Sequence, residues 1–338
     1  MDKKCVLVTG GLGYIGSHTV VVLINEGYDV VIVDNLSNSD KMILDRITAI
    51  TSVRPIFYES DLFDIAALHK IFIKHSFDIV IHFAALKSVA ESVINPLLYF
   101  RSNLTTLTNV LQMMKDFVVK NIIFSSSATV YGEPDVLPVT ECSPFKESLS
   151  AYGSTKQICE EMLRKVTADS NIQNISLRYF NPVGAHSSGL IGELPKNIPN
   201  NAFPYIMKVA ACKLEKFTVF GNDYNTPDGS CLRDYLHVVD LAKVHVQSCK
   251  RLLAKEQISS YEVFNIGTGN AYSVIEIIAA FERISGKKLN YEIGPRRDGD
   301  VAAIYADVTK ANNILGWKAE LGLEEMIKSS WQWEKNQA

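Results

Sequence analysis

The stretch VTGGLGYIGSH, residues 8–18, decides the fold that we expect for this chain. It stands between an apolar run, CVLVTG (5–10), and a segment near 14–26 with helical character. Glycines at 10, 13 and 16 allow a tight turn, a close approach of the backbone to a pyrophosphate, and close packing of helix on strand. The free N–H groups at the start of the helix then favour a phosphate. The context predicts a dinucleotide-binding turn rather than a turn that merely needs glycine.

The pattern of this first strand and helix repeats along the first half of the chain. Runs rich in Val and Ile, DVVIVD (29–34), FDIVIHFAA (77–85) and NIIFSSSA (121–128), are typical of buried parallel strands. Helices are expected near 64–75, 91–117 and 151–168, and a further strand at ISLRYFNP (175–182). Alternation of this kind predicts an α/β fold with a doubly wound parallel sheet and right-handed crossovers.

The texture of the sequence changes after Pro182. Residues 184–204 are rich in Gly, Pro and Asn, which is typical of a binding loop. Beyond them we expect helices near 204–214, 240–254, 273–285 and 322–335, and strands at FTVFG (217–221) and EVFNIGTG (262–269). The sequence therefore predicts a larger domain over 1–180 and a smaller mixed α/β domain over 181–338. The chain is expected to cross back to the first domain near 230–270.

Asp34 ends the second expected strand, 18 residues after Gly16. A carboxylate at this place accepts hydrogen bonds from ribose hydroxyls and repels a 2′-phosphate. The cofactor predicted from the residues is therefore NAD rather than NADP.

The segment AYGSTK (151–156) places Tyr152 four residues before Lys156 on an expected helix, so both side chains share one face. Tyrosine, with a pKa near ~10, is a poor base unless a neighbouring ammonium favours the phenolate. Ser127 lies at the carboxyl end of an expected strand, where ligands bind to parallel sheets. The pair alone would indicate an exposed helix face. Together with the glycine turn and Asp34, it predicts a proton-transfer site of Tyr152, Lys156 and Ser127.

Composition excludes several classes of function. Lys plus Arg number 34 against 37 Asp plus Glu, so no basic excess points to nucleic acid or to a membrane surface. The six cysteines are scattered without metal-ligand spacing, which predicts reduced thiols in a cytoplasmic protein and no metal site. The N-terminal segment lacks the pattern of a signal peptide, and no apolar run reaches the ~18 residues of a membrane span.

Four motifs together resemble one protein family. They are the glycine turn, SSSATVYG (125–132), the Y-x-x-x-K of 152–156, and RYFNPVGAH (178–186). This set is similar to the extended short-chain dehydrogenase/reductase family and, within it, to the UDP-glucose 4-epimerases. The resemblance extends to LEEMIKSSWQW (323–333) and is most specific at 221–242 and 296–311.

The resemblance implies a Rossmann-type fold with tightly held NAD, a smaller UDP-sugar domain and a homodimer. It implies interconversion of UDP-galactose and UDP-glucose by transient oxidation at C4, through a 4-keto sugar. Tyr152 would remove the O4 proton with help from Ser127, while Lys156 would hold the ribose and lower the pKa of Tyr152.

The resemblance also implies the residues of both binding sites. Those for NAD are Gly10, Gly13, Tyr14, Ile15, Gly16, Asp34, Asn35, Leu36, Ser37, Asn38, Ser39, Asp61, Leu62, Phe83, Ala84, Ala85, Lys87, Asn103, Ser125, Tyr152, Lys156, Tyr179 and Phe180. Those for the UDP-sugar are Lys87, Ser127, Tyr152, Asn181, Asn200, Asn201, Phe220, Arg233, Arg297 and Asp300. For Arg233, an ion pair with Asp234 or Asp240 is the structural alternative.

Two positions depart from the family pattern. Ser102 stands where asparagine is frequent in the family. Ile304 stands where glucose-specific members carry a tyrosine. The smaller side chain of Ile304 predicts a wider sugar pocket that is open to UDP-N-acetylhexosamines. A 4,6-dehydratase of the same fold would need an Asp-Glu pair at the places held by Ala128 and Thr129. The remaining alternatives are a net dehydrogenase exchanging free NAD(P)H and a non-catalytic NAD-binding protein, which would have no use for the three proton-transfer residues.

Overall fold

The computed structural model describes residues 3–196, 199, 201–297 and 300–337. The chain forms two compact units, which we call the first and the second unit. The first comprises Met1–Gly132, Phe145–Arg178 and Ala242–Phe264, and the second comprises Glu133–Pro144, Tyr179–Leu241 and Asn265–Ala338. The units therefore differ from the expected division at 180/181 in two places: residues 133–144 and 179–180 belong to the second unit. The segment that returns to the first unit is 242–264.

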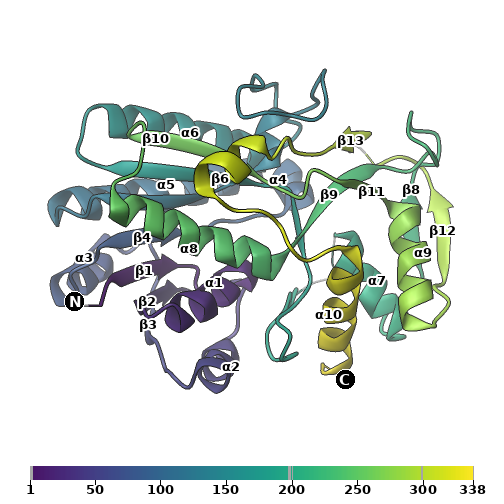
Figure 1. The fold of residues 1–338 in the computed structure, drawn as a ribbon, viewed down its shortest axis with the longest axis horizontal. Coiled ribbons are helices and arrows are strands. Elements are labelled where there is room, and N and C mark those ends of the chain that lie inside the picture. The colour runs from purple at the N-terminus through teal and green to yellow at the C-terminus, as the bar shows by residue number, and fades with distance from the viewer. Residues whose placement is uncertain (1–2, 197–198, 200, 298–299, 338) are drawn as a thin grey trace. The chain divides into compact units, whose positions relative to one another are not determined.

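The first unit is built around a seven-stranded sheet of order β10-β6-β5-β4-β1-β2-β3 (Figure 1). Its strands are β1 (Cys5–Thr9), β2 (Asp29–Asp34), β3 (Ile56–Glu59), β4 (Ile79–His82), β5 (Asn121–Ser127), β6 (Gln173–Tyr179) and β10 (Tyr261–Ile266). Strand β1 pairs in parallel with β2 and β4, β2 pairs with β3, and β4 pairs with β5. The strand order reverses at β1 and β4, and ligands bind at such a point in doubly wound sheets. The predicted fold class is confirmed.

The helices of this part of the chain are α1 (Tyr14–Asn25), α2 (Met42–Thr51), α3 (Ile65–Lys74), α4 (Val89–Ile94), α5 (Pro96–Asp116), α6 (Ala151–Ala168) and α8 (Val238–Ala254). The single helix expected over 91–117 was wrong. Asn95 takes non-helical angles between α4 and α5, because the ring of Pro96 disfavours a helical conformation in the residue before it. Helix α6 has its predicted bounds, since the Ser150 hydroxyl accepts from the Gly153 N–H and caps its start.

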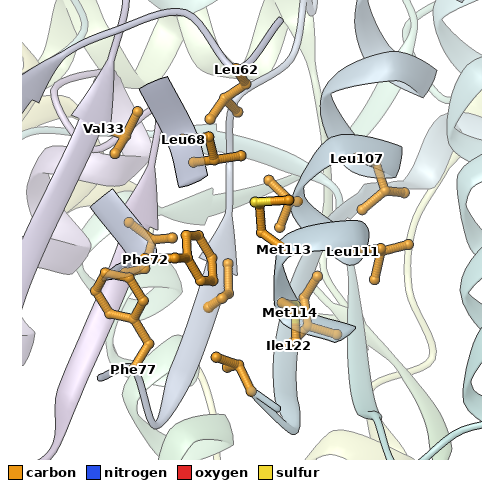
Figure 2. Close-up of a cluster of buried hydrophobic side chains, with 14 of the residues drawn as sticks. Val33, Leu62, Leu68, Phe72, Phe77, Leu107, Leu111, Met113, Met114 and Ile122 are labelled. Atoms are coloured by element: carbon orange, nitrogen blue, oxygen red, sulfur yellow. The ribbon is translucent and has the colours of Figure 1, made fainter. Parts of the chain in front are cut away.

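One core cluster holds α3 and α5 against the sheet (Figure 2). Val80 and Ile122 come from the sheet, Phe72 from α3, and Leu107 and Met114 from α5, and all five are buried. Each such side chain contributes about 1.5–3 kcal/mol through its removal from water. The strands are apolar on both faces because helices cover both, as the sequence pattern predicted.

The second unit is a smaller mixed α/β structure, as predicted. Its elements are β7 (Asn181–Val183), α7 (Ala202–Ala210), β8 (Phe217–Phe220), β9 (Leu232–His237), β11 (Ala271–Ser273), α9 (Val274–Ser285), β12 (Tyr291–Gly294), β13 (Ala303–Ile304) and α10 (Leu323–Lys335). Strand β9 pairs antiparallel with β11 and in parallel with β13 and β7, while β12 pairs with β8. Helices α7, α9 and α10 share an apolar core that includes Ile206, Phe281 and Ile327.

Several short elements were not predicted. Strand β3 is a four-residue edge strand with two exposed side chains, so it shows no apolar run. Helix α2 buries Ile43, Leu44 and Ile47, a helical spacing that was available in the sequence. Strand β9 was missed because Arg233 and Asp234 interrupt its apolar residues. Among the described residues, no helix has the length and apolar character that crossing a bilayer requires.

Candidate active site

The glycine turn connects β1 to α1 at the point where the strand order reverses. Gly10 has φ +69°, and a Cβ there would lie 2.9 Å from the Ala84 nitrogen. A Cβ at Gly16 would collide with the carbonyl of Gly10, so only glycine fits. Gly13 caps α1 without a side-chain hydrogen bond, and the first helical turn holds no acidic residue. The N–H groups and positive helix end are therefore suited to the pyrophosphate of NAD.

Asp34 lies at the carboxyl end of β2, beside this turn. Its side chain is only 8% exposed and accepts from the Leu12 N–H (3.0 Å), the Leu36 N–H (2.9 Å) and the Ser39 hydroxyl (2.7 Å). Nearby, the Asn35 amide donates to Asp61 at 2.9 Å. These bonds fix a carboxylate next to the phosphate-binding turn, where a ribose with a free 2′-hydroxyl would lie. The arrangement fits NAD.

Further predicted cofactor residues follow β4. The Phe83 ring centroid lies 4.8 Å from that of His245, and the Lys87 ammonium lies 6.0 Å from the Tyr14 ring centroid. Asn103 is buried on α5, where its amide group donates to the Leu86 carbonyl and to the Thr155 hydroxyl. Both of its amide hydrogens are thus used to join α5 to α6 and to the loop after β4. The Oδ1 atom accepts from the Leu86 N–H at 2.9 Å. A direct contact of Asn103 with NAD stays a prediction, and it would have to use the second lone pair of Oδ1.

The predicted proton-transfer residues meet between β5 and α6. Ser127 ends β5, and its side chain lies near enough to Tyr152 to act to lower the pKa of that phenol. One helical turn further on, Lys156 is buried and donates to the Ser125 carbonyl at 2.5 Å. Its ammonium lies 5.8 Å from the Tyr152 ring centroid. The structure therefore brings Tyr152, Lys156 and Ser127 together.

The chain without its cofactor does not show a lowered pKa for Tyr152, so the expected effect of Lys156 stays a prediction for the NAD-bound protein. Burial raises the pKa of Tyr152 to about 12, and this effect outweighs the lowering effect of Ser127. Burial also lowers the pKa of Lys156 to about 8, so the ammonium stays mostly protonated at pH 7 and loses its proton above about pH 8. The ammonium lies near the face of the ring and is bonded to a carbonyl, which limits its influence on the phenol. Lys156 alone does not turn Tyr152 into a base.

Sequence reasoning missed Glu160, one turn beyond Lys156, and its partner Arg178 on β6. The Arg178 guanidinium binds the carboxylate with Nε–Oε1 and Nη2–Oε2 distances of 2.9 and 2.7 Å. Both side chains are buried, at 2% and 4% exposure. The available signal was the interval of four residues that Glu160 shares with Tyr152 and Lys156 on α6.

The second unit gathers four of the predicted UDP-sugar residues. Asp300 accepts from Arg297 (Nη2–Oδ1 2.9 Å) and from Arg233 (Nη2–Oδ1 3.4 Å). The Arg297 guanidinium carbon lies 5.3 Å from the centroid of the Phe220 ring, which is 40% exposed. Ile304 on β13 stands beside Arg233 on β9 in the strand register. Two arginines with one carboxylate leave a net positive cluster beside an accessible aromatic ring.

The alternative partners named for Arg233 are engaged elsewhere. Asp234 accepts from the backbone of Thr268, Gly269 and Ala306, and Asp240 accepts from the N–H groups of Glu320 and Leu321.

Other predicted residues of the second unit are more dispersed. Asn181 begins β7, and Asn201 precedes α7 without capping it through its side chain. Tyr179 and Phe180 are buried. Asn200 lies outside the described residues. Among the described residues, no group of three His, Cys, Asp or Glu side chains is placed to hold a metal ion.

Comparison with known proteins identifies the family. The family model described as GDP-mannose 4,6 dehydratase matches residues 7–330. UDP-glucose 4-epimerase of Bacillus subtilis is 50% identical over 332 residues, with 98% of this chain and 97% of the relative covered. The chain belongs to the UDP-glucose 4-epimerase family.

Solved epimerase structures share the complete fold. The UDP-glucose 4-epimerase of Bifidobacterium longum in complex with NAD+ and UDP has a TM-score of 0.94, 48% identity and 98% coverage of both chains. That of Stenotrophomonas maltophila with bound NAD and formylated UDP-arabinopyranose has a TM-score of 0.96 and 45% identity, covering 99% of this chain and 98% of that one. NAD is therefore the cofactor of this epimerase fold, and the glycine turn and Asp34 fit it.

The dehydratase in the name of the family model does not match the chemistry of this site. A 4,6-dehydratase eliminates water across C5–C6 after oxidation at C4, and this elimination needs an acid and a base beside the strand-end serine. Here Ala128 and Thr129 follow Ser127 in a 3₁₀ turn, and the Thr129 hydroxyl donates to Ser127 at 3.0 Å. Neither side chain can exchange a proton near neutral pH, which favours the epimerase relatives over the dehydratase.

Proposed function

We propose that this chain interconverts UDP-galactose and UDP-glucose by NAD-dependent transient oxidation at C4 of the sugar. The observation that carries the proposal is the placement of Tyr152 beside Ser127, with Lys156 one turn away and held by the Ser125 carbonyl, on a sheet whose glycine turn fits NAD. The epimerase relatives, at about half identity over nearly the full length, support the same conclusion. A non-catalytic NAD-binding protein would not need this proton-transfer site.

We assign Tyr152 as the general base that removes the proton of the C4 hydroxyl as the sugar is oxidised. It returns the proton as general acid when the sugar is reduced. Ser127 holds the same oxygen and links it to the phenol. The chemistry supplied by bound NAD is acceptance of hydride from C4, its return to the opposite face of the 4-keto sugar, and a positive charge that favours the phenolate. Lys156, held by the Ser125 carbonyl, is assigned a ribose hydroxyl of the cofactor.

We assign NAD binding to the first unit and UDP-sugar binding to the second. Arginine suits a diphosphate because its planar guanidinium donates two parallel hydrogen bonds, so Arg233 and Arg297 are assigned the diphosphate. Phe220 exposes enough of its ring to pack against a base. Asp300 holds both arginines in place before the ligand arrives.

Ile304 supports a second activity on the same site. Isoleucine is smaller than the tyrosine of glucose-specific members and has no hydroxyl, and Ile304 lies beside Arg233 in the register of β13 and β9. We propose that the sugar pocket also admits UDP-N-acetylhexosamines. Measurement of kcat/KM for UDP-galactose and UDP-N-acetylgalactosamine tests this, and undetectable turnover of the latter would contradict it.

We further propose that the protein is a homodimer. Helices α4, α5 and α6 lie next to one another and expose large apolar side chains: Val93 at 62%, Ile94 at 77%, Leu97 at 82% and Ile158 at 41%. We expect the same face of a second subunit to pack against these apolar side chains of α4, α5 and α6. Light scattering should give twice the chain mass, and Leu97→Glu should give monomers. The control Ile73→Glu, on the 64%-exposed Ile73 of α3, should remain dimeric; a monomeric unmodified chain would contradict the proposal.

A cytoplasmic location is proposed from the cysteines. All six are free thiols, which fits a reducing compartment. Thiol counting in a freshly lysed cell extract should find six per chain, and a disulfide in that sample would contradict the proposal.

The activity itself is tested by incubating the purified protein with UDP-galactose and no added cofactor. UDP-glucose should accumulate to equilibrium, because the cofactor is regenerated in each turnover and stays bound. A 4-keto-6-deoxy product would identify a dehydratase instead. Strict dependence on added NAD(P)H would identify a net oxidoreductase.

A further inference from the structure

Three consecutive serines at the end of β5 each contact one residue of α6. The Ser127 side chain lies beside Tyr152 and acts on its pKa, and the Ser125 carbonyl accepts from Lys156. Between them, the Ser126 hydroxyl donates a hydrogen bond to Oε1 of Glu160. Residues 152, 156 and 160 are spaced by four, so they form one line along the helix. The contact at Glu160 is therefore the third point at which the strand end is joined to the catalytic face of α6.

Glu160 is itself fixed from two further strands. Arg178 on β6 binds both carboxylate oxygens, and the Tyr261 hydroxyl on β10 donates to Oε2 at 2.9 Å. Arg178 also donates to the Tyr131 hydroxyl at 2.9 Å, and its guanidinium lies 5.0 Å from the centroid of that ring. One carboxylate on α6 thus joins the helix to β5, β6 and β10.

The burial of this pair points to a role in specificity rather than in stability. Glu160 and Arg178 are almost completely removed from water, and every carboxylate oxygen is hydrogen-bonded. A buried ion pair is often no more stabilising than apolar residues of the same size. Apolar contacts have no preferred direction. Directional hydrogen bonds, in contrast, fix the position and rotation of α6 relative to β5.

We propose that Glu160 is a positioning residue for the C4 chemistry. Through Ser126 it sets the register between β5 and α6 at which Ser127 reaches the phenol of Tyr152 and the Ser125 carbonyl holds Lys156. This inference rests on the proposed function, since it assigns Glu160 to the same proton-transfer site. It predicts that loss of the Ser126–Glu160 bond affects the chemical step and leaves UDP binding intact.

The decisive variant is Ser126→Ala, which removes the third contact and keeps the buried ion pair. We expect kcat to fall by about five- to tenfold, because small displacements of reacting groups slow catalysis steeply. The KM for UDP-galactose and the calorimetric Kd for UDP should stay within about twofold, as for an interaction used only in the chemical step. The matched control is Ser248→Ala, a buried serine of α8 that bonds only within its own helix to Val244.

Glu160→Met extends the test. It removes the acceptor of the Ser126 hydroxyl and leaves the Arg178 guanidinium without its counter-charge, so both Tm and kcat should fall. Because Ser126 acts through Glu160, the double variant Ser126→Ala/Glu160→Met should have the same kcat as Glu160→Met alone.

The inference is overturned if kcat of Ser126→Ala equals that of Ser248→Ala, or if the two substitutions multiply in their effect on kcat. Failure of the proposed function looks different: the unmodified protein would then not convert UDP-galactose, whatever the state of Ser126.

Discussion

The residues assigned to chemistry and those assigned to substrate binding are held in different ways. In the first unit, Lys156 and Glu160 are buried and bonded to the strand end, which fixes Tyr152 and Ser127. In the second unit, Arg297 and Phe220 keep 42% and 40% exposure, and Arg297 is joined to Asp300 by an ion pair near the surface. Proton transfer requires fixed distances, whereas a binding site must remain open to its ligand. The difference predicts that substitutions in the first unit lower kcat and those in the second raise KM.

The largest expected effect is a loss of kcat on substitution of Tyr152, a residue of the first unit. Tyr152→Phe removes the base and should lower kcat by about 10³- to 10⁴-fold, while the Kd for UDP measured by calorimetry stays within about twofold. Tyr291→Phe, at an exposed tyrosine of β12, is the control and should retain full activity. Substantial turnover by Tyr152→Phe would remove this residue as the base.

The next effect concerns stability and pH, and it belongs to the first unit. The pKa of Lys156 is lowered to about 8 by burial, so between about pH 8 and 10 the unfolded chain holds a proton that the folded chain has lost. The contribution of this group to the free energy of unfolding therefore rises with pH in that window, by about 1.4 kcal/mol per pH unit.

Chemical denaturation of the wild type and Lys156→Met across this pH window measures that contribution as a difference, in which the effects of other titrating groups cancel. Lys165→Met, at an exposed lysine of the same helix, is the matched control and should show a flat difference. A difference that falls with pH would mean that burial does not dominate the titration of Lys156.

A smaller effect is expected in the second unit. Arg233→Met removes one of two guanidinium groups assigned to the diphosphate and should raise KM for UDP-galactose by about ten- to thirtyfold, with kcat changed less than about threefold. Arg54→Met, which breaks an exposed ion pair with Asp45, should change neither constant. A fall in kcat with unchanged KM would contradict the proposal that the second unit serves substrate binding and the first unit serves the chemical step.

The smallest expected effect concerns sugar selectivity at Ile304 in the second unit. Ile304→Tyr fills space beside Arg233 and should lower kcat/KM for UDP-N-acetylgalactosamine by at least about tenfold, while UDP-galactose changes by less than about threefold. Ile304→Val serves as the control, because it adds no bulk. Equal losses with both sugars would show that position 304 does not select the substituent at C2.

Much of the first unit could be predicted because its signals are local. The glycine turn, Asp34 at a strand end, and helix α6 with its serine cap each lie within one short segment. The break between α4 and α5 was not predicted, although Pro96 is a local signal for it. The second unit was harder to predict, because β7, β11 and β13 are two or three residues long and exist only by pairing with β9.

The sequence by itself determined the doubly wound sheet, the preference for NAD, and the three residues that we propose for the proton-transfer site, because hydrophobic periodicity and residue spacing are properties of neighbours along the chain. Only the tertiary structure decided that Asp300 is the partner of Arg233, that Glu160 joins α6 to three strands, and that burial raises the pKa of Tyr152. Those features depend on which distant segments come together and on how completely they exclude water, and neither is written in any single segment.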